Sequence, residues 1–117
     1  MTSALLATLT TQEQVEALIV SPSSGWILKH SCTCPVSTAA HDEVLSALAR
    51  HPLPAGMVVV QESRPLSNWL AARLGYVHQS PQLFLVRGGT VLWQASHWGI
   101  TSTSMAAAVG RTAAPTG

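Results

Sequence analysis

The 117-residue chain has few charged side chains and no long apolar run, and both absences exclude classes of function. Charged residues make up only 9% of the sequence, and the formal net charge is +1 without any basic or acidic block. This balance gives no electrostatic basis for binding nucleic acid or an anionic membrane surface. No stretch approaches the roughly 18 consecutive apolar residues that a membrane-spanning helix needs. We therefore expect neither nucleic acid nor a membrane among the partners of this protein.

Cysteine is scarce as well, because only Cys32 and Cys34 are present. A disulfide between them would close a trivial loop with strained geometry, so it cannot staple a fold. Residues 1–9 are mildly apolar but lack the positively charged start and the long apolar core of a secretory signal peptide. These absences favour the reducing cytoplasm as the location of the protein.

The chain does have a large apolar fraction, 47%, which at this length supports one packed domain over residues 1–117. Apolar spacing, capping residues and turn residues then predict eight elements and a tail. In chain order these are a helix after the capping-box pair Thr10 and Glu13, a strand at 26–29, a helix at 35–50, a strand at 57–60, a helix at 65–74, a hairpin of strands 83–86 and 91–93, a helix at 101–111 and a frayed tail at 112–117.

This order predicts an α/β, thioredoxin-like domain with a central four-stranded mixed sheet, flanking helices and an extra N-terminal helix. The first two strands are joined through a helix and should form a parallel pair with a right-handed crossover. In such a fold the reactive cysteine lies between the first core strand and the next helix, which is the position of Cys34. A cis proline that faces this cysteine precedes the third core strand, and Ser80-Pro81 has that position. We therefore expect the Ser80–Pro81 bond to be cis.

Cys34 stands where an apolar strand gives way to a helix that Pro35 opens. Unpaired backbone N–H groups and the helix dipole stabilise a thiolate there, and the thiolate attacks disulfides or binds metals. Lys29 or His30 would lower the thiol pKa further if either side chain pointed at the sulfur. Ser37 stands where a dithiol enzyme would have its second cysteine. Its hydroxyl either donates a hydrogen bond to the thiolate or, as that of a residue in the first helical turn, bonds the backbone.

Four separated blocks of sequence resemble the monothiol bacilliredoxins, which are thioredoxin-like proteins of the bacillithiol system of certain bacteria. The blocks are 29–31 with 34–37, then 59–68, 78–82 and 95–98, in the order of the family. The resemblance implies a thiol–disulfide oxidoreductase that removes bacillithiol from mixed disulfides on cytoplasmic proteins, with Cys34 as the nucleophile. It implies no bound cofactor, bacillithiol as co-substrate, and bacillithiolated proteins and a low-molecular-weight thiol as partners. The cysteine at position 32 departs from the family pattern.

Cys32 therefore has three interpretations. It acts as an upstream resolving thiol that forms a strained, easily reduced disulfide with Cys34. Alternatively, it completes a zinc or copper site with Cys34 and His30, or it is a small loop residue without a role. The chain offers no second ligand pair at diagnostic spacing, so we expect no metal.

Contacts with the substrate are predicted for Pro35, Ser80, Pro81, His97 and Trp98, because a cis proline exposes neighbouring backbone groups to an extended ligand. The structural alternatives are a strand-start role for Pro81, a core or rim position for Trp98 and a helix-cap role for His97.

Two other functions remain open at this point. One is a thioredoxin-fold module that binds partners without turnover, and the other is an iron–sulfur or metal carrier that uses Cys34.

Overall fold

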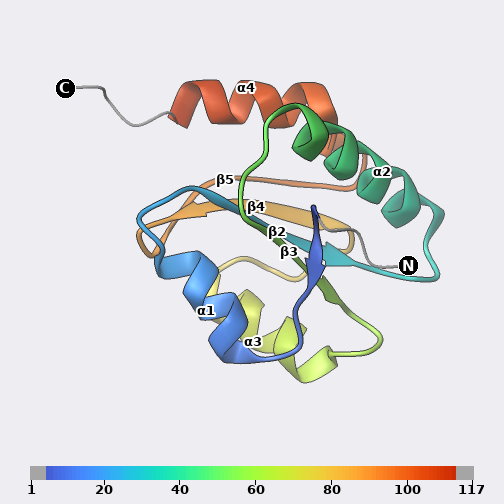
Figure 1. The fold of residues 1–117 in the computed structure, drawn as a ribbon. Helices are drawn as coiled ribbons and strands as arrows, with labels where there is room; N and C mark the ends of the chain where they lie inside the picture. Colours follow the sequence, from blue (N-terminus) through green and yellow to red (C-terminus); the bar gives the residue numbers. More distant parts are fainter. Residues whose placement is uncertain (1–4, 113–117) are drawn as a thin grey trace.

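The structure is built on a five-stranded mixed sheet with two helices on each face (Figure 1). This computed structural model describes residues 5–112. In chain order the elements are β1 (Ala7–Thr8), α1 (Gln12–Val20), β2 (Gly25–His30), α2 (Pro35–Arg50), β3 (Ala55–Val59), α3 (Arg64–Leu74), β4 (Gln82–Arg87), β5 (Thr90–Ser96), the 3-10 turn η1 (His97–Gly99) and α4 (Ser102–Thr112).

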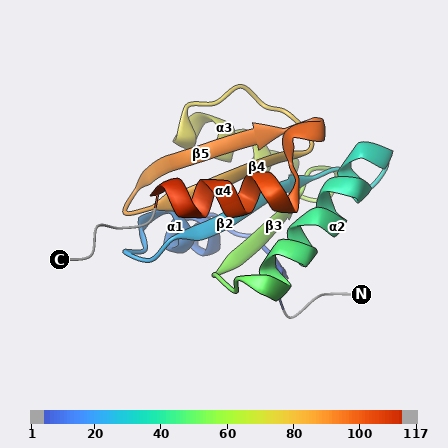
Figure 2. The same ribbon diagram turned by 90° about the horizontal axis from the view of Figure 1, so that it is seen from above.

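The strands lie in the order β1-β3-β2-β4-β5, so β2 is central. Strands β1, β3 and β2 run parallel, whereas β4 is antiparallel to both β2 and β5. Helices α2 and α4 cover one face of the sheet and α1 and α3 the other, and the view from above shows α2 and α4 on the near side of the strands (Figure 2). The cysteine segment follows the C-terminal end of β2. Because β2 is the central strand, this segment begins at the middle of one end of the sheet, between the two helix layers.

Apolar side chains of β2 alternate between two buried clusters, as the period of a strand dictates. Trp26 and Leu28 pack in the cluster beneath α2 and α4. Ile27 packs in the cluster with α1 and α3, and Lys29 faces the same side by alternation. This burial on both faces explains why β2 is almost continuously apolar.

The predicted order of elements and the parallel pairing of the first two core strands are confirmed, and α2 has the predicted bounds. The sheet, however, has five strands and not four. The additional strand, β1, has two residues and pairs with Gly56 and Met57 of β3. So short a strand carries no alternation that could predict it. Gly56 permits the close approach, since a Cβ there would overlap the side chain of Leu9.

The capping box of α1 is one residue later than predicted. Thr11 is the N-cap and accepts a hydrogen bond from the Gln14 N–H at 3.2 Å. The Gln14 side-chain oxygen in turn accepts from the N–H groups of Thr11, at 3.2 Å, and Thr10, at 2.8 Å. Glutamine thus fulfils the role that the prediction assigned to Glu13, because either amide or carboxylate oxygen accepts these bonds.

The C-terminal helix extends to Thr112, which the sequence placed in a tail. The Thr112 carbonyl accepts a hydrogen bond from the Arg87 guanidinium at 3.0 Å, and this bond ties the helix end to the hairpin. Residues 113–117, the remainder of the predicted tail, lie outside the described residues.

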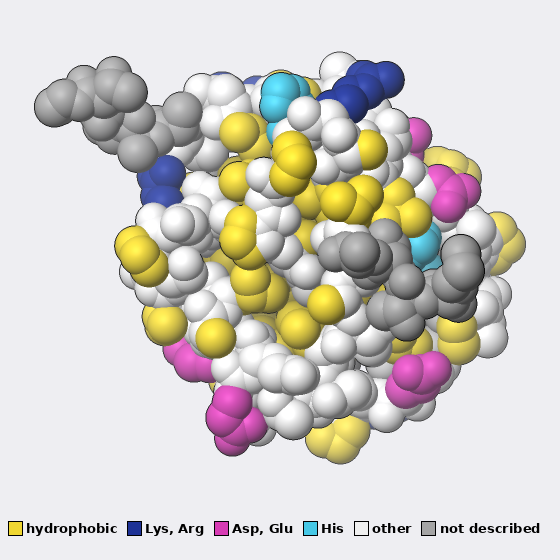
Figure 3. Space-filling model, in the orientation of Figure 1, with side chains coloured by type: hydrophobic (Ala, Val, Ile, Leu, Met, Phe, Trp, Pro, Cys, Tyr) yellow, Lys and Arg dark blue, Asp and Glu magenta, His cyan; other side chains and the backbone are white. Residues whose placement is uncertain are grey.

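Hydrophobic side chains gather across the middle of the face that carries β1 (Figure 3). A shallow hollow there is lined in part by Leu9, Leu18 and Leu53. None of the helices within residues 5–112 combines the length and apolarity needed to cross a membrane.

Candidate active site at the start of helix α2

The two cysteines lie in the short connection between the central strand and α2. Residues 31–34 form a tight turn in which the Cys34 N–H donates to the Ser31 carbonyl at 3.4 Å. Cys34 is the N-cap of α2, in extended conformation, and Pro35 opens the helix as predicted. Both cysteines are free thiols, with Cys32 exposed and Cys34 partly buried.

The start of the helix lowers the pKa of the Cys34 thiol below its ordinary value. The Ser37 backbone N–H has the largest effect, and the Val36 N–H and the Ser37 hydroxyl add to it, while partial burial opposes them. These N–H groups belong to the first turn of α2, where no intrahelical carbonyl is available to accept from them. The thiolate stabilisation is therefore a property of the helix start and not of Lys29 or His30.

Ser37 acts on both the Cys34 thiol and the first residue of the cysteine turn. Its side chain is fully buried, and its hydroxyl oxygen accepts a hydrogen bond from the Ser31 N–H at 3.2 Å. The same hydroxyl is among the donors that lower the pKa of Cys34. The two alternatives considered for Ser37 thus hold together, since it bonds a backbone group and also stabilises the thiolate.

Lys29 and His30 are buried bases whose charged forms are disfavoured. The Lys29 side chain is fully buried, its Nζ has no hydrogen-bond partner among the described residues, and burial lowers its pKa to about 8. Burial also lowers the pKa of His30, and His41, whose ring centroid lies 5.4 Å away, lowers it further. Contact with the Ser37 backbone opposes that shift. Burial thus disfavours a positive charge on either side chain, and neither is among the groups that lower the pKa of Cys34.

The Ser80–Pro81 peptide bond is cis, as predicted. In the β2–β4 register Gln82 lies opposite Lys29, so Pro81 lies one position further, beside the end of β2 where the cysteine turn begins. The Pro81 carbonyl accepts a hydrogen bond from the His97 N–H at 3.0 Å. The Ser80 hydroxyl is buried and has no partner among the described residues. Three of the predicted substrate-contacting residues are thus joined at one end of the sheet.

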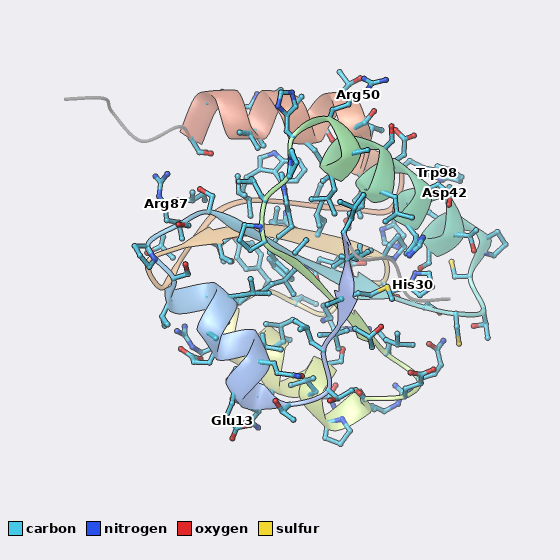
Figure 4. All side chains as sticks on the ribbon, viewed as in Figure 1. Glu13, His30, Asp42, Arg50, Arg87 and Trp98 are labelled. Carbon is cyan, nitrogen blue, oxygen red and sulfur yellow. The ribbon has the colours of Figure 1, made fainter. Side chains whose placement is uncertain are left out.

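Trp98 is not a core residue, since 71% of its side chain is exposed. It lines a cleft of about 370 Å³ between α2 and η1, together with His97, Asp42 and Glu43. His30, Asp42 and Trp98 lie at the same end of the molecule, opposite Arg87 (Figure 4). Exposure at the rim of this cleft leaves the indole available to a ligand.

His97 has a positive φ of 53°, a conformation that is uncommon for a non-glycine residue and repeatedly found at functional sites. The alternative that His97 caps α4 is wrong, because Thr101 fulfils this role. Its hydroxyl accepts from the Ser104 N–H at 2.9 Å.

Gln61, in the turn between β3 and α3, is a contributor that the sequence analysis did not single out. Its side-chain amide contacts residues 31–33 through three hydrogen bonds. The position falls within the second block of the family resemblance, but nothing in the local pattern indicates a contact almost thirty residues upstream.

Within residues 5–112 no three side chains from His, Cys, Asp or Glu are grouped so that they could hold a metal ion.

Comparison with known proteins agrees with this geometry. The sequence profile of the family described as monothiol bacilliredoxin BrxC matches residues 7–105. A solved structure described as a proposed oxidoreductase with a thioredoxin fold is 32% identical, with a TM-score of 0.84, over 89% of this chain and 93% of that one.

Thioredoxins from Trypanosoma brucei brucei and Fasciola hepatica are 10% and 15% identical, with TM-scores of 0.76 and 0.73. The matches cover 91% and 90% of this chain, and 88% and 97% of those chains. They establish the fold alone, and the predicted thioredoxin-like architecture is thereby confirmed. Family and fold together support a thiol redox role. Since the profile covers most of its length, the chain belongs to the monothiol bacilliredoxin family.

Proposed function

We propose that this protein is a thiol–disulfide oxidoreductase that removes bacillithiol from mixed disulfides on cytoplasmic proteins. The observation that carries the proposal is the environment of Cys34. Its thiolate is stabilised by the first turn of α2, and Ser37 stands where a second thiol would be. A lowered pKa makes more of the thiol available as thiolate, which is the form that attacks a disulfide.

In the first step the Cys34 thiolate attacks the bacillithiol sulfur of a protein–bacillithiol disulfide. That disulfide breaks, the protein thiolate leaves and takes up a proton, and Cys34 becomes disulfide-bonded to bacillithiol. In the second step a low-molecular-weight thiolate attacks the bacillithiol sulfur of this intermediate. It forms a low-molecular-weight disulfide, and Cys34 leaves as a thiolate. Because Ser37 cannot attack the intermediate, the external thiol completes the cycle.

The substrate would lie along the cysteine turn. Pro35 and Pro81 would contact it, backbone groups near Ser80 would bond it, and His97 and Trp98 would contact its far side. No bound cofactor is needed for this cycle, because bacillithiol enters as co-substrate. We assign no role to nucleic acid or membranes.

The decisive experiment compares wild type, Cys32→Ser and Cys34→Ser with a bacillithiolated protein and follows all adducts by intact mass. We expect Cys34→Ser to abolish removal of bacillithiol, with any effect of Cys32→Ser confined to the second step. Comparable activity in Cys34→Ser would contradict the proposal. Capture of bacillithiol without its release to an external thiol would instead indicate a binding module without turnover.

A further inference from the structure

The turn that carries Cys32 is bound by the side chain of one residue distant in the sequence, Gln61. The Cys32 N–H donates to Gln61 Oε1 at 3.2 Å. Gln61 Nε2 donates to Ser31 Oγ at 2.7 Å and to Thr33 Oγ1 at 3.2 Å. Three consecutive residues of the turn are thus bound by one side-chain amide. We call these three hydrogen bonds the Gln61 clamp.

A glutamine suits these partners chemically. A backbone N–H can only donate, so Cys32 needs the amide oxygen, and the two hydroxyl oxygens then receive the two N–H bonds of the amide. A glutamate at this position would keep the acceptor and lose both donors. An apolar residue would lose all three bonds.

Gln61 projects from a backbone that is itself well fixed. The Val60 N–H donates to the His30 carbonyl at 2.9 Å, which continues the β2–β3 pairing up to the turn. The N–H groups of Glu62 and Ser63 both donate to the Val59 carbonyl, at 3.1 and 2.9 Å. The backbone that carries Gln61 is therefore held by hydrogen bonds to β2 and to the end of β3.

The clamp acts on Cys32 more than on Cys34. Cys34 is positioned by the start of α2, whereas the Cys32 N–H bonds directly to Gln61. A Cys32–Cys34 disulfide needs the two Cβ atoms about 3.8 Å apart and their sulfurs at bonding distance. Only Thr33 separates the two cysteines, so a disulfide between them would close a very short, strained loop, and the turn would have to change shape to form it. That change would lengthen the clamp bonds.

We propose that Gln61 is a positioning residue that disfavours the Cys32–Cys34 disulfide and so keeps this two-cysteine site working with one thiol. The reaction it limits is attack by the Cys32 thiolate on Cys34 Sγ of a mixed disulfide between Cys34 and a small thiol. This attack forms the Cys32–Cys34 bond, breaks the mixed disulfide and releases the small thiolate, which takes up a proton. The clamp bonds are made in the dithiol form, so they stabilise that form relative to the internal disulfide.

The test measures the internal disulfide in buffers of reduced and oxidised glutathione, by intact mass after alkylation. We expect Gln61→Leu to raise the equilibrium constant for the Cys32–Cys34 disulfide by about tenfold, the factor that one net hydrogen bond supplies. Thr33→Val, which removes one bond from the other side of the clamp, should give a smaller shift in the same direction. Glu62→Gln, in the same turn, should behave as wild type.

An unchanged equilibrium constant in Gln61→Leu, with wild-type thermal unfolding, would overturn the proposal. A slower alkylation of Cys34 in the double variant Gln61→Leu with Cys32→Ser than in Cys32→Ser alone would also overturn it, because Gln61 would then act on Cys34. The inference rests on the proposed function only for the role of Cys34 as the attacking thiol. Since the assay contains glutathione and no bacillithiolated protein, failure of debacillithiolation would leave its result intact.

Discussion

At the scale of single residues, the proposed cycle makes the lifetime of a mixed disulfide on Cys34 depend on Ser37. This hydroxyl stabilises the Cys34 thiolate but cannot attack a disulfide. We predict that Ser37→Cys places a resolving thiol beside Cys34, so that the bound small thiol leaves without an external thiol. Intact mass of the trapped adduct over time would measure this as a shortening of its lifetime by at least about tenfold.

The matched control is Thr38→Cys, because residue 38 is the exposed neighbour on the same helical turn. It adds an exposed thiol at a residue that does not act on the Cys34 thiol, and it should leave the adduct lifetime unchanged. Equal shortening in both variants would mean that any nearby thiol suffices, and that the position of Ser37 has no special importance.

At the scale of elements, the first turn of α2 controls the charge of Cys34. The backbone N–H groups of Ser37 and Val36 hold the thiol pKa below its ordinary value only when the helix is formed. We predict that in Cys32→Ser the alkylation rate of Cys34 reaches its plateau at a lower pH than in the same protein unfolded in guanidinium. The measurement is the pH profile of alkylation by iodoacetamide. Coincident folded and unfolded profiles would show that the helix start does not act on the thiol.

The elements that could be predicted from sequence are those with a local cause. Pro35 opens α2 at the predicted residue, and Gly75 ends α3 with a left-handed φ of 77°. Strand β1 could not be predicted, because its two residues gain their structure only from pairing with β3. Cys34 and the cis bond before Pro81 followed from their order in the fold. The contact of Gln61 with the cysteine turn could not, since it depends on side-chain geometry across a long sequence separation.

At the scale of the whole molecule, Lys29 places an unpartnered amine inside the fold. Its chain lies on the central strand among apolar side chains, and burial lowers its pKa to about 8 from an ordinary value of 10.5. The charge of Lys29 also contributes to lowering the pKa of His78. The protonated form of Lys29 is therefore less favourable in the folded protein than in the unfolded chain.

The sign of the effect on stability follows from proton binding. Below about pH 8 Lys29 is protonated in both states, and the folded protein bears the cost of a buried charge. Between about pH 8 and 10.5 the unfolded chain keeps the proton and the folded protein loses it, so the free energy of unfolding rises with pH. The full rise is on the order of 3 kcal/mol, because each unit of pKa difference corresponds to about 1.4 kcal/mol.

We therefore predict that Lys29→Met abolishes this rise and makes the protein more stable than its parent at pH 7. Denaturant unfolding between pH 7 and 10 would measure it, with Cys34→Ser as the parent so that the thiol does not titrate. Arg50→Met, which removes an exposed cation from the end of α2, should keep the rise. A Lys29→Met variant that is less stable than its parent at pH 7, with an unchanged pH dependence, would mean that the amine is stabilised by a partner in the folded protein. The same measurement thus distinguishes a lysine whose buried charge destabilises the folded protein from one whose charge is stabilised there.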